Sequence, residues 1–101
     1  MAFARLAVFP GGTEEQHRAI SEVLGDAQTH APGRIMFAAG PVSEGWQIIQ
    51  VWERQEQLES WVEAHLGAAF AKVGSRGYPA PPRITDFEVT DLLLGSAVVA
   101  P

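Results

Sequence analysis

Apolar residues concentrate in four short segments whose length and composition are typical of β-strands. The segments are rich in β-branched and aromatic residues, and glycine, proline or helical sequence bounds each of them. They cover residues 2–9, 35–39, 46–52 and 84–89. A helix is predicted over residues 14–24, because Thr13 and Gln16 form a capping box and Gly25 is a common helix terminator.

A second, longer helix is predicted between the third and fourth strands. Its apolar stripe has the 3.6-residue period of a helix face and consists of Leu58, Trp61, Val62, His65, Leu66, Ala69, Phe70 and Val73. Gly67 is a point where this helix can kink or divide. Residues 26–33 and 74–82 are predicted to be irregular. The order β-α-β-β-α-β predicts an α+β, ferredoxin-like fold, which is a four-stranded antiparallel sheet with both helices on one face.

The predicted strands are apolar on both faces, although the helices cover only one. Ile48 and Ile49 point to opposite faces of the third strand, and so do Val51 and Trp52. A sheet open to water on one side normally alternates apolar and polar residues. Because the chain has no spare element for the second face, we predict a homodimer with two sheets packed together. The apolar run 92–94 is a candidate for crossing onto the partner.

Composition and charge narrow the class of protein. The chain has 101 residues, of which 47% are hydrophobic, and it contains no cysteine. We expect one domain over residues 1–94 and a loose tail over residues 95–101. Seven basic against twelve acidic residues argue against nucleic acid as a partner. Because we see neither a signal-peptide pattern nor an apolar stretch of about 18 residues, we expect a cytoplasmic protein without a membrane span.

An ordered set of segments carries a resemblance to a known group of proteins. The segments lie within about residues 3–90 and are 9–16 (FPGGTEEQ), 38–41 (AAGP), 45–46 (GW), 51–53 (VWE) and 61–67 (WVEAHLG). Together they resemble the dimeric α+β barrel superfamily, in its antibiotic-biosynthesis-monooxygenase-like branch. The resemblance implies a homodimer with one pocket per protomer, between the sheet and the long helix. It also implies activities found in the group, which include cofactor-free oxygenation of polyketide-type aromatic molecules, haem degradation, and lyase or isomerase reactions.

The chain departs from this group at positions that make the expected pocket more apolar. Oxygenases of the group often place an asparagine in the site, and this chain contains none. Haem-degrading relatives carry a histidine late in the long helix, near the place of Phe70 and Ala71, so haem degradation is not expected here. Phe37 stands where small relatives frequently have a histidine. We therefore expect no cofactor and no metal.

One face of the third strand carries the first candidate site. Trp46, Ile48, Gln50 and Trp52 share this face. The resemblance implies that Trp52 faces the helices and the pocket, so Gln50 becomes a polar group among aromatic side chains, as in many ligand sites. The alternative is that Trp46 and Trp52 are plain core and that Gln50 is bonded to the backbone.

The histidines supply the candidate acid or base. His65 is the titratable residue within the apolar stripe, where a buried imidazole is suited to general acid–base catalysis. The alternative is a partly exposed histidine at the edge of the stripe, or one bonded to a backbone carbonyl. His17, among charged neighbours, is expected to be solvated, and His30 lies in a loop. Their spacing does not favour a metal site.

Three further residues border the expected pocket. Tyr78 lies in the glycine- and proline-rich segment before the last strand, where it can close the pocket mouth and donate a hydrogen bond; the alternative is packing against Pro79. Arg34 and Arg83 flank strands and are candidates for holding a carboxylate or an enolate, although such residues are more often surface or interface charges.

These features predict a homodimeric, cofactor-independent enzyme acting on a hydrophobic, aromatic or polyketide-like molecule. His65 is the predicted base and Gln50 orients a substrate oxygen. The predicted substrate-binding residues are Trp52, Trp46, Trp61, Phe37, Phe70 and Tyr78. A monooxygenase is the leading possibility, and a cyclase, isomerase or lyase and a non-catalytic ligand-binding dimer are the alternatives. A cavity of about 300 Å³ beside Gln50 and His65 favours an enzyme or a binding protein, whereas a solid core favours a structural role.

Overall fold

The helices and strands follow the predicted order in the computed structural model, which describes residues 2–95. They are β1 (Ala2–Pro10), α1 (Glu14–Leu24), α2 (Asp26–Thr29), β2 (Arg34–Val42), β3 (Gly45–Trp52), α3 (Gln55–Trp61), the π-helical turn η1 (Val62–Leu66), α4 (Gly67–Val73), the 3-10 turn η2 (Gly74–Arg76) and β4 (Arg83–Val89). The segments 26–33 and 74–82, which were predicted to be irregular, therefore each contain a short helical turn: α2 lies in the first and η2 in the second.

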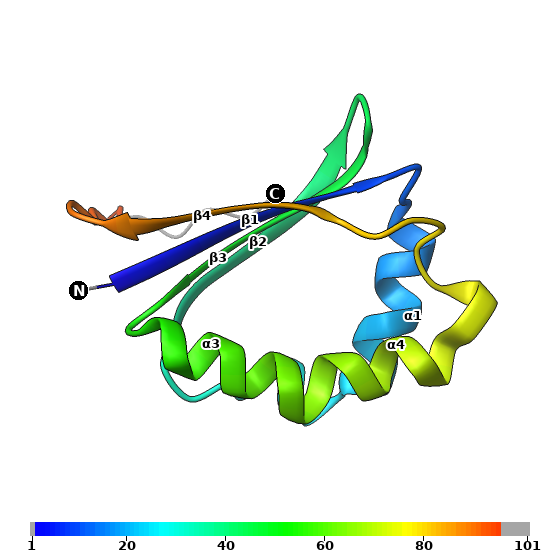
Figure 1. The fold of residues 1–101 in the computed structure, drawn as a ribbon, viewed down its shortest axis with the longest axis horizontal. Helices are drawn as coiled ribbons and strands as arrows, with labels where there is room; N and C mark the ends of the chain where they lie inside the picture. Colours follow the sequence, from blue (N-terminus) through cyan, green and yellow to red (C-terminus); the bar gives the residue numbers. More distant parts are fainter. Residues whose placement is uncertain (1, 96–101) are drawn as a thin grey trace.

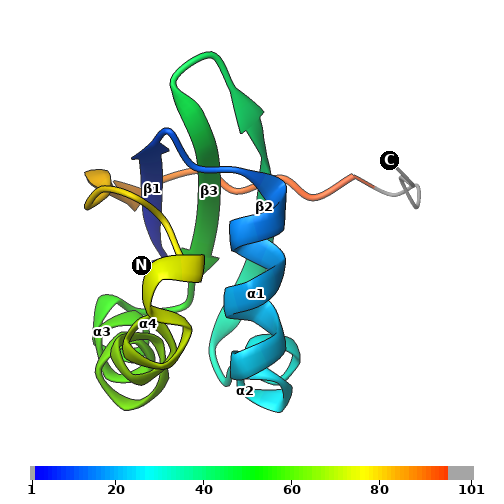
Figure 2. The same ribbon diagram turned by 90° about the vertical axis from the view of Figure 1, so that its right-hand side faces the viewer.

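The four strands form one antiparallel sheet in the order β2-β3-β1-β4. The helices α1, α3 and α4 all lie on one side of this sheet (Figure 1). In Figure 2 the α3–α4 helix is seen end-on, and α1 runs upright beside it. The predicted ferredoxin-like α+β fold is confirmed.

The helix α1 begins as its sequence predicts. The Thr13 hydroxyl accepts a hydrogen bond from the backbone N–H of Gln16 at 3.2 Å, and the Gln16 side chain accepts one from the Thr13 N–H at 2.9 Å. This capping box satisfies two backbone donors that the first turn leaves free. Gly25, with φ of 53°, ends the helix in a region that favours glycine.

The main core lies between the helices and the sheet. Phe3 and Trp52 are partners across β1 and β3, and both belong to a buried cluster with Ile20, Leu58 and Val73. Trp52 and Leu58 have no exposed surface. Burial of apolar side chains of this size stabilises the folded chain by about 1.5–3 kcal/mol each.

The long helix is divided, as expected near Gly67, but by a π-helical turn. The Gly67 N–H bonds to the carbonyl of Val62, five residues earlier, so η1 holds one residue more than an α-helical turn. The flanking helices α3 and α4 both keep their apolar sides on the core. No helix within residues 2–95 is long and apolar enough to cross a membrane.

The second face of the sheet is partly covered by the chain itself. Ala4, Val8 and Val51 point away from the helices, because they alternate with core residues, and yet they are buried. Beyond β4, residues 90–95 turn back and cross the sheet on this same side (Figures 1 and 2). The segment is neither helix nor strand, so the described chain has no further element on the second face, but it does place coil there, which was not predicted from the sequence.

Large apolar side chains nevertheless stay exposed around this face. Phe87 of β4 is 55% exposed, and Leu93, in the crossing segment, is 85% exposed. The run 92–94 belongs to this crossing segment, and its packing against a partner chain stays a prediction. Of the predicted loose tail, residues 96–101 lie outside the described residues.

Candidate functional site

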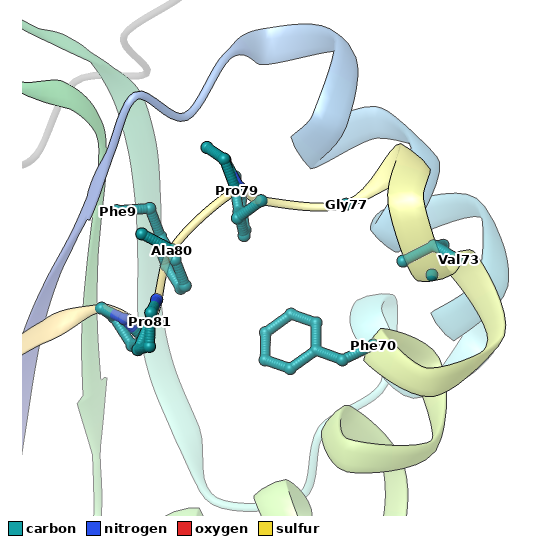
Figure 3. A pocket seen from close by; sticks show the side chains of 10 residues that line it. Phe9, Phe70, Val73, Gly77, Pro79, Ala80 and Pro81 are labelled. Atoms are coloured by element: carbon teal, nitrogen blue, oxygen red, sulfur yellow. The ribbon is translucent and has the colours of Figure 1, made fainter.

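An apolar cavity of about 380 Å³ opens between β1, α4 and the segment that precedes β4. Its walls are Phe9 of β1, Phe70 and Val73 of α4, and residues 77–82, which precede β4. Phe70 projects from α4 toward this proline-rich segment (Figure 3). The volume falls within the range of about 300–1,000 Å³ that is usual for small-molecule sites. We call this space the outer cavity.

A second cavity of about 30 Å³, the inner cavity, lies deeper, between α1, the sheet and the long helix. It has room for about one water molecule. Phe9, Phe70 and Tyr78 line both cavities, which together we call the crevice. The Tyr78 ring stacks on Phe9 with 3.9 Å between ring centres, and Phe70 meets both rings edge-on at 6.3 and 6.4 Å. These three rings therefore form an aromatic partition between the outer and inner cavities.

His17 lies directly behind this partition. Its Nδ1 and the Tyr78 hydroxyl are joined by a hydrogen bond of 3.2 Å. The imidazole lies 5.2 Å from the Trp46 ring and 6.0 Å from the Phe37 ring. Burial lowers the pKa of His17, Arg18 adds to this effect and Glu14 opposes it, so the neutral ring is favoured. Burial also raises the pKa of Tyr78 well above its usual value, so its phenol stays protonated.

The expectation that His17 is solvated is wrong. His17 precedes Ile20 and Leu24 by three and seven residues, and both of those side chains belong to the core. Residues at this spacing share one helix face. The period of α1 therefore contained the signal, and the charged neighbours Glu14 and Arg18, which pair with each other, masked it.

His65 lies on the exposed side of the long helix. The structure therefore agrees with the alternative that His65 lies at the edge of the apolar stripe. Its nearest aromatic contact is Trp61, with 6.3 Å between ring centres. The extra residue of the π-helical turn explains the difference, because it turns Leu66 toward the core and His65 outward. The two predicted catalytic residues, His65 and Gln50, are not brought together, and neither lines the outer cavity.

Gln50 is buried but already bonded. Its side-chain oxygen accepts a hydrogen bond from the Trp52 indole N–H at 3.1 Å. The partner is therefore a side chain and not the backbone. Trp52 and Trp46 are core residues, and the Trp46 indole N–H has no hydrogen-bond acceptor among the described residues.

The other predicted substrate-binding residues surround the inner cavity. Phe37, Trp61, Phe70 and Tyr78 all line it. The Trp61 indole N–H donates to the carbonyl of Ala27 at 2.8 Å, which fixes the ring against α2. Residues of the sheet, of α1, of the long helix and of the segment before β4 meet at this cavity.

Arg34 is the second functional candidate that the sequence left ambiguous. It opens β2 on the helix side of the sheet, opposite Trp52, and is half-buried. Burial lowers the pKa of its guanidinium, which still remains charged at neutral pH. Arg83, by contrast, lies exposed in an ion pair with Glu44.

The described residues offer no metal centre. Within residues 2–95, no three histidine or carboxylate side chains gather in the way a metal site requires. The polar side chains that line the inner cavity are those of His17, Ser21, Gln28 and Tyr78. Arg34 lies beside this cavity, against two of its walls, Phe37 and Trp61.

Comparison with solved structures shows the same fold in several proteins, at low sequence identity. The putative antibiotic biosynthesis monooxygenase from Chloroflexus aurantiacus J-10-fl is 16% identical, with a TM-score of 0.66 over 94% of this chain and 100% of that one. A dimeric ferredoxin-like protein of unknown function from Thermobifida fusca is 14% identical, with a TM-score of 0.65 over 88% and 92%. A mutant of MhuD with two manganese protoporphyrin IX molecules bound per active site is 21% identical, with a TM-score of 0.62 over 94% and 100%. By sequence, the chain matches no protein-family model and no curated protein. The chain has the fold of antibiotic-biosynthesis-monooxygenase-like proteins.

Proposed function

We propose that the protein is a cytoplasmic, homodimeric, cofactor-independent enzyme that acts on a hydrophobic, aromatic or polyketide-like molecule, with His17 as its base. One observation carries the proposal. A ligand-sized apolar cavity lies on one side of the partition formed by Phe9, Phe70 and Tyr78, and a half-buried histidine, which favours its neutral form, is bonded to Tyr78 on the other side. The monooxygenase names of several proteins with this fold support the same class of chemistry.

The proposal requires Tyr78 to move. The inner cavity of about 30 Å³ is too small for an aromatic ring. Rotation of Tyr78 out of the partition breaks its hydrogen bond to His17 and joins the two cavities. An aromatic ligand then replaces the Tyr78 ring against Phe9 and Phe70, and Nδ1 of His17 is left free to accept a proton. A base whose pKa lies near the working pH is efficient in such a step.

The proposed reaction is the oxidation of an activated methylene group by O2. His17 takes one proton from the methylene carbon, and the resulting carbanion reduces O2 to form a carbon-bound peroxide. Loss of the second proton from that carbon and cleavage of the O–O bond give a ketone and one water molecule. The substrate supplies both electron pairs, so no further reductant is needed.

A non-oxidative reaction is the second candidate. The absence of asparagine from the chain removes the residue that oxygenases of this group often use. The same proton transfer to His17, followed by return of the proton to another atom, gives an isomerisation, cyclisation or elimination without O2. The two candidates share the base and differ only in whether O2 is consumed.

We do not assign haem to the site, although the MhuD mutant binds a manganese porphyrin. The inner cavity has room for about one water molecule. Near the place where haem-degrading relatives carry a histidine, the long helix has Phe70 and Ala71. His17, the histidine inside the crevice, is bonded to Tyr78.

The function is tested by following O2 uptake with anthrone as the probe substrate. His17→Ala is expected to lower turnover by about 100-fold or more, because general-base catalysis contributes about 10²- to 10⁴-fold. His65→Ala is the matched control, since it removes the same side chain from the exposed side of the long helix, and it is expected to stay within about 2-fold of wild type.

The outcomes distinguish the candidate functions. Anthrone consumption with stoichiometric O2 uptake supports the oxygenase, and consumption under nitrogen supports the non-oxidative enzyme. Binding without turnover of any enolisable probe supports a ligand-binding dimer. Full activity in His17→Ala removes His17 from the mechanism.

The proposed homodimer uses the side of the sheet opposite the helices. Phe87 lies on this side and is exposed, and the Thermobifida fusca neighbour is a dimeric protein. Ile84, on the same strand but the opposite face, is similarly exposed at 49% and provides a matched control. In sedimentation at micromolar concentration, Phe87→Glu is expected to give monomers and Ile84→Glu dimers. A monomeric wild type contradicts the homodimer.

A further inference from the structure

Arg34 lies within a cage of three aromatic rings beside the inner cavity. Its guanidinium carbon is 4.8 Å from the centre of the Trp61 ring, 4.9 Å from Phe37 and 5.3 Å from Trp52. Each cation–π contact of this kind is attractive, because the negative face of the ring meets the positive charge. Phe37 and Trp61 also line the inner cavity, so the cage and the cavity share two walls.

The charge of Arg34 has no anionic partner among the described residues. Four of the other arginines pair with a carboxylate: Arg5 with Asp86, Arg18 with Glu14, Arg54 with Glu56 and Arg83 with Glu44. Those pairs lie at the surface or partly exposed, whereas Arg34 is half-buried and no carboxylate of the described chain lies within 4 Å of it. Removing a charge from water without a counter-ion is costly, so an unpaired guanidinium at this depth is a strong attractor for an anion.

The hydrogen bonds of the guanidinium are also incomplete. One terminal nitrogen donates to the backbone carbonyl of Gln28 at 2.7 Å, and the other donates to the Gln28 side-chain oxygen at 3.1 Å. The buried Nε of Arg34 has no acceptor among the described residues. Both oxygens that bind Arg34 are therefore neutral amide oxygens. A carboxylate in place of the side-chain amide forms charge-assisted bonds, which are about twice as strong.

We propose that Arg34 is the anion-recognition residue of the crevice and that the ligand is a flat aromatic molecule carrying a carboxylate. Once Tyr78 has left the partition and the two cavities have joined, the carboxylate displaces the Gln28 side-chain oxygen from Arg34. The aromatic body then extends from Phe37 and Trp61 toward Phe9 and Phe70. Gln28 lines the inner cavity, so a ligand inside it meets the group that it must displace. The inference rests on the proposed function, because it places the ligand in the same crevice.

A local structural role for Arg34 is the competing account. Arg34 binds the backbone of α2 through Gln28, and Trp61 binds the same short helix through Ala27. Under that account, Arg34 anchors α2 and contributes no selectivity for charge. The two accounts differ in whether the protein distinguishes a carboxylate from a neutral group of the same shape.

Calorimetric titration with 2-naphthoate and 2-naphthamide tests this difference. The two probes have the same aromatic body and differ in charge. We expect wild type to bind 2-naphthoate at least about 10-fold more tightly than 2-naphthamide. Arg34→Gln is expected to lose this preference and to bind the two probes with equal affinity. Arg83→Gln, which removes an exposed arginine, is expected to keep the wild-type preference.

The outcomes separate this inference from the proposed function. Equal binding of both probes by wild type overturns the anion site and leaves the aromatic crevice standing. An undiminished preference in Arg34→Gln also overturns the anion site. Binding of neither probe contradicts the proposed aromatic site itself. If Arg34→Gln does not fold, Arg34→Lys serves in its place, and we expect it to lose at least about 3-fold of the preference because an ammonium group cannot bind a carboxylate in a fork.

Discussion

The helices α1 and α3–α4 each carry a histidine, and the two histidines lie in opposite environments. His17 is half-buried beside the Trp46 and Phe37 rings and is bonded to Tyr78, whereas His65 is exposed. The neighbouring residues in the sequence suggest the opposite, since His17 closely follows two glutamates and His65 lies within an apolar stripe. The difference lies in the backbone: α1 is a regular helix, and the long helix contains a π-helical turn. Helical period therefore decides burial, and it must be counted along the helix that actually forms.

Deletion of one residue from each helix is the strongest test of the difference between the two helices. Removing Ala19 from α1 rotates the two parts of the helix by about 100° relative to each other. Either Ile20 and Leu24 leave the core, or the capped first turn of the helix leaves its place. Loss of two buried side chains costs about 3–6 kcal/mol. Removing Ala64 from η1 converts the π-helical turn to an α-helical one and keeps both flanking helices in phase, so a much smaller loss of stability is expected than for the Ala19 deletion.

Urea unfolding measures both deletions. A stable Ala19 deletion, or an Ala64 deletion that unfolds the protein, contradicts the role given to the π-helical turn.

The sequence predicted the fold well because its signals are local. Strand composition, the capping box at Thr13 and the stripe through Leu58 and Val73 each act within a few residues. These signals give the order of the elements, and that order restricts the topology to a small set. The ferredoxin-like sheet followed from them.

The site was less predictable because it depends on where separate elements meet. No pattern in the sequence brings Tyr78 to His17, which are 61 positions apart. The π-helical turn changed the direction of His65, and nothing in the stripe distinguished it from an ordinary helix. Likewise, only the three-dimensional structure shows that no carboxylate of the described residues lies near Arg34.

The hydrogen bond between Tyr78 and His17 offers a smaller, sharper test. Tyr78→Phe keeps the ring that stacks on Phe9 and removes the hydroxyl. We expect it to lower the free energy of unfolding by about 0.5–1.5 kcal/mol, the usual net contribution of one hydrogen bond. Chemical denaturation measures the change, and a variant as stable as wild type contradicts a bond of normal strength.

The pH dependence of stability is expected to show the smallest effect. Burial lowers the folded-state pKa of His17 below the value of 6.5 expected in the unfolded chain. The unfolded chain then binds more protons, so this contribution to stability is present above about pH 6.5 and is lost as the pH falls through the folded-state pKa. Replacing His17 with glutamine is expected to flatten the stability curve between about pH 7.5 and about pH 5, whereas His65→Gln should leave the contribution of His17 in place. Equal slopes in wild type and His17→Gln contradict the assignment.

Titration of the imidazole signals by nuclear magnetic resonance tests the account most directly. Spectra of wild type and of the two single histidine variants assign the signals of His17 and His65. The account predicts that the His17 ring titrates with a midpoint below 6.5 and that its signal shifts in Tyr78→Phe. A His17 midpoint at or above 6.5 that does not respond to Tyr78→Phe would contradict a half-buried, neutral base behind the aromatic partition.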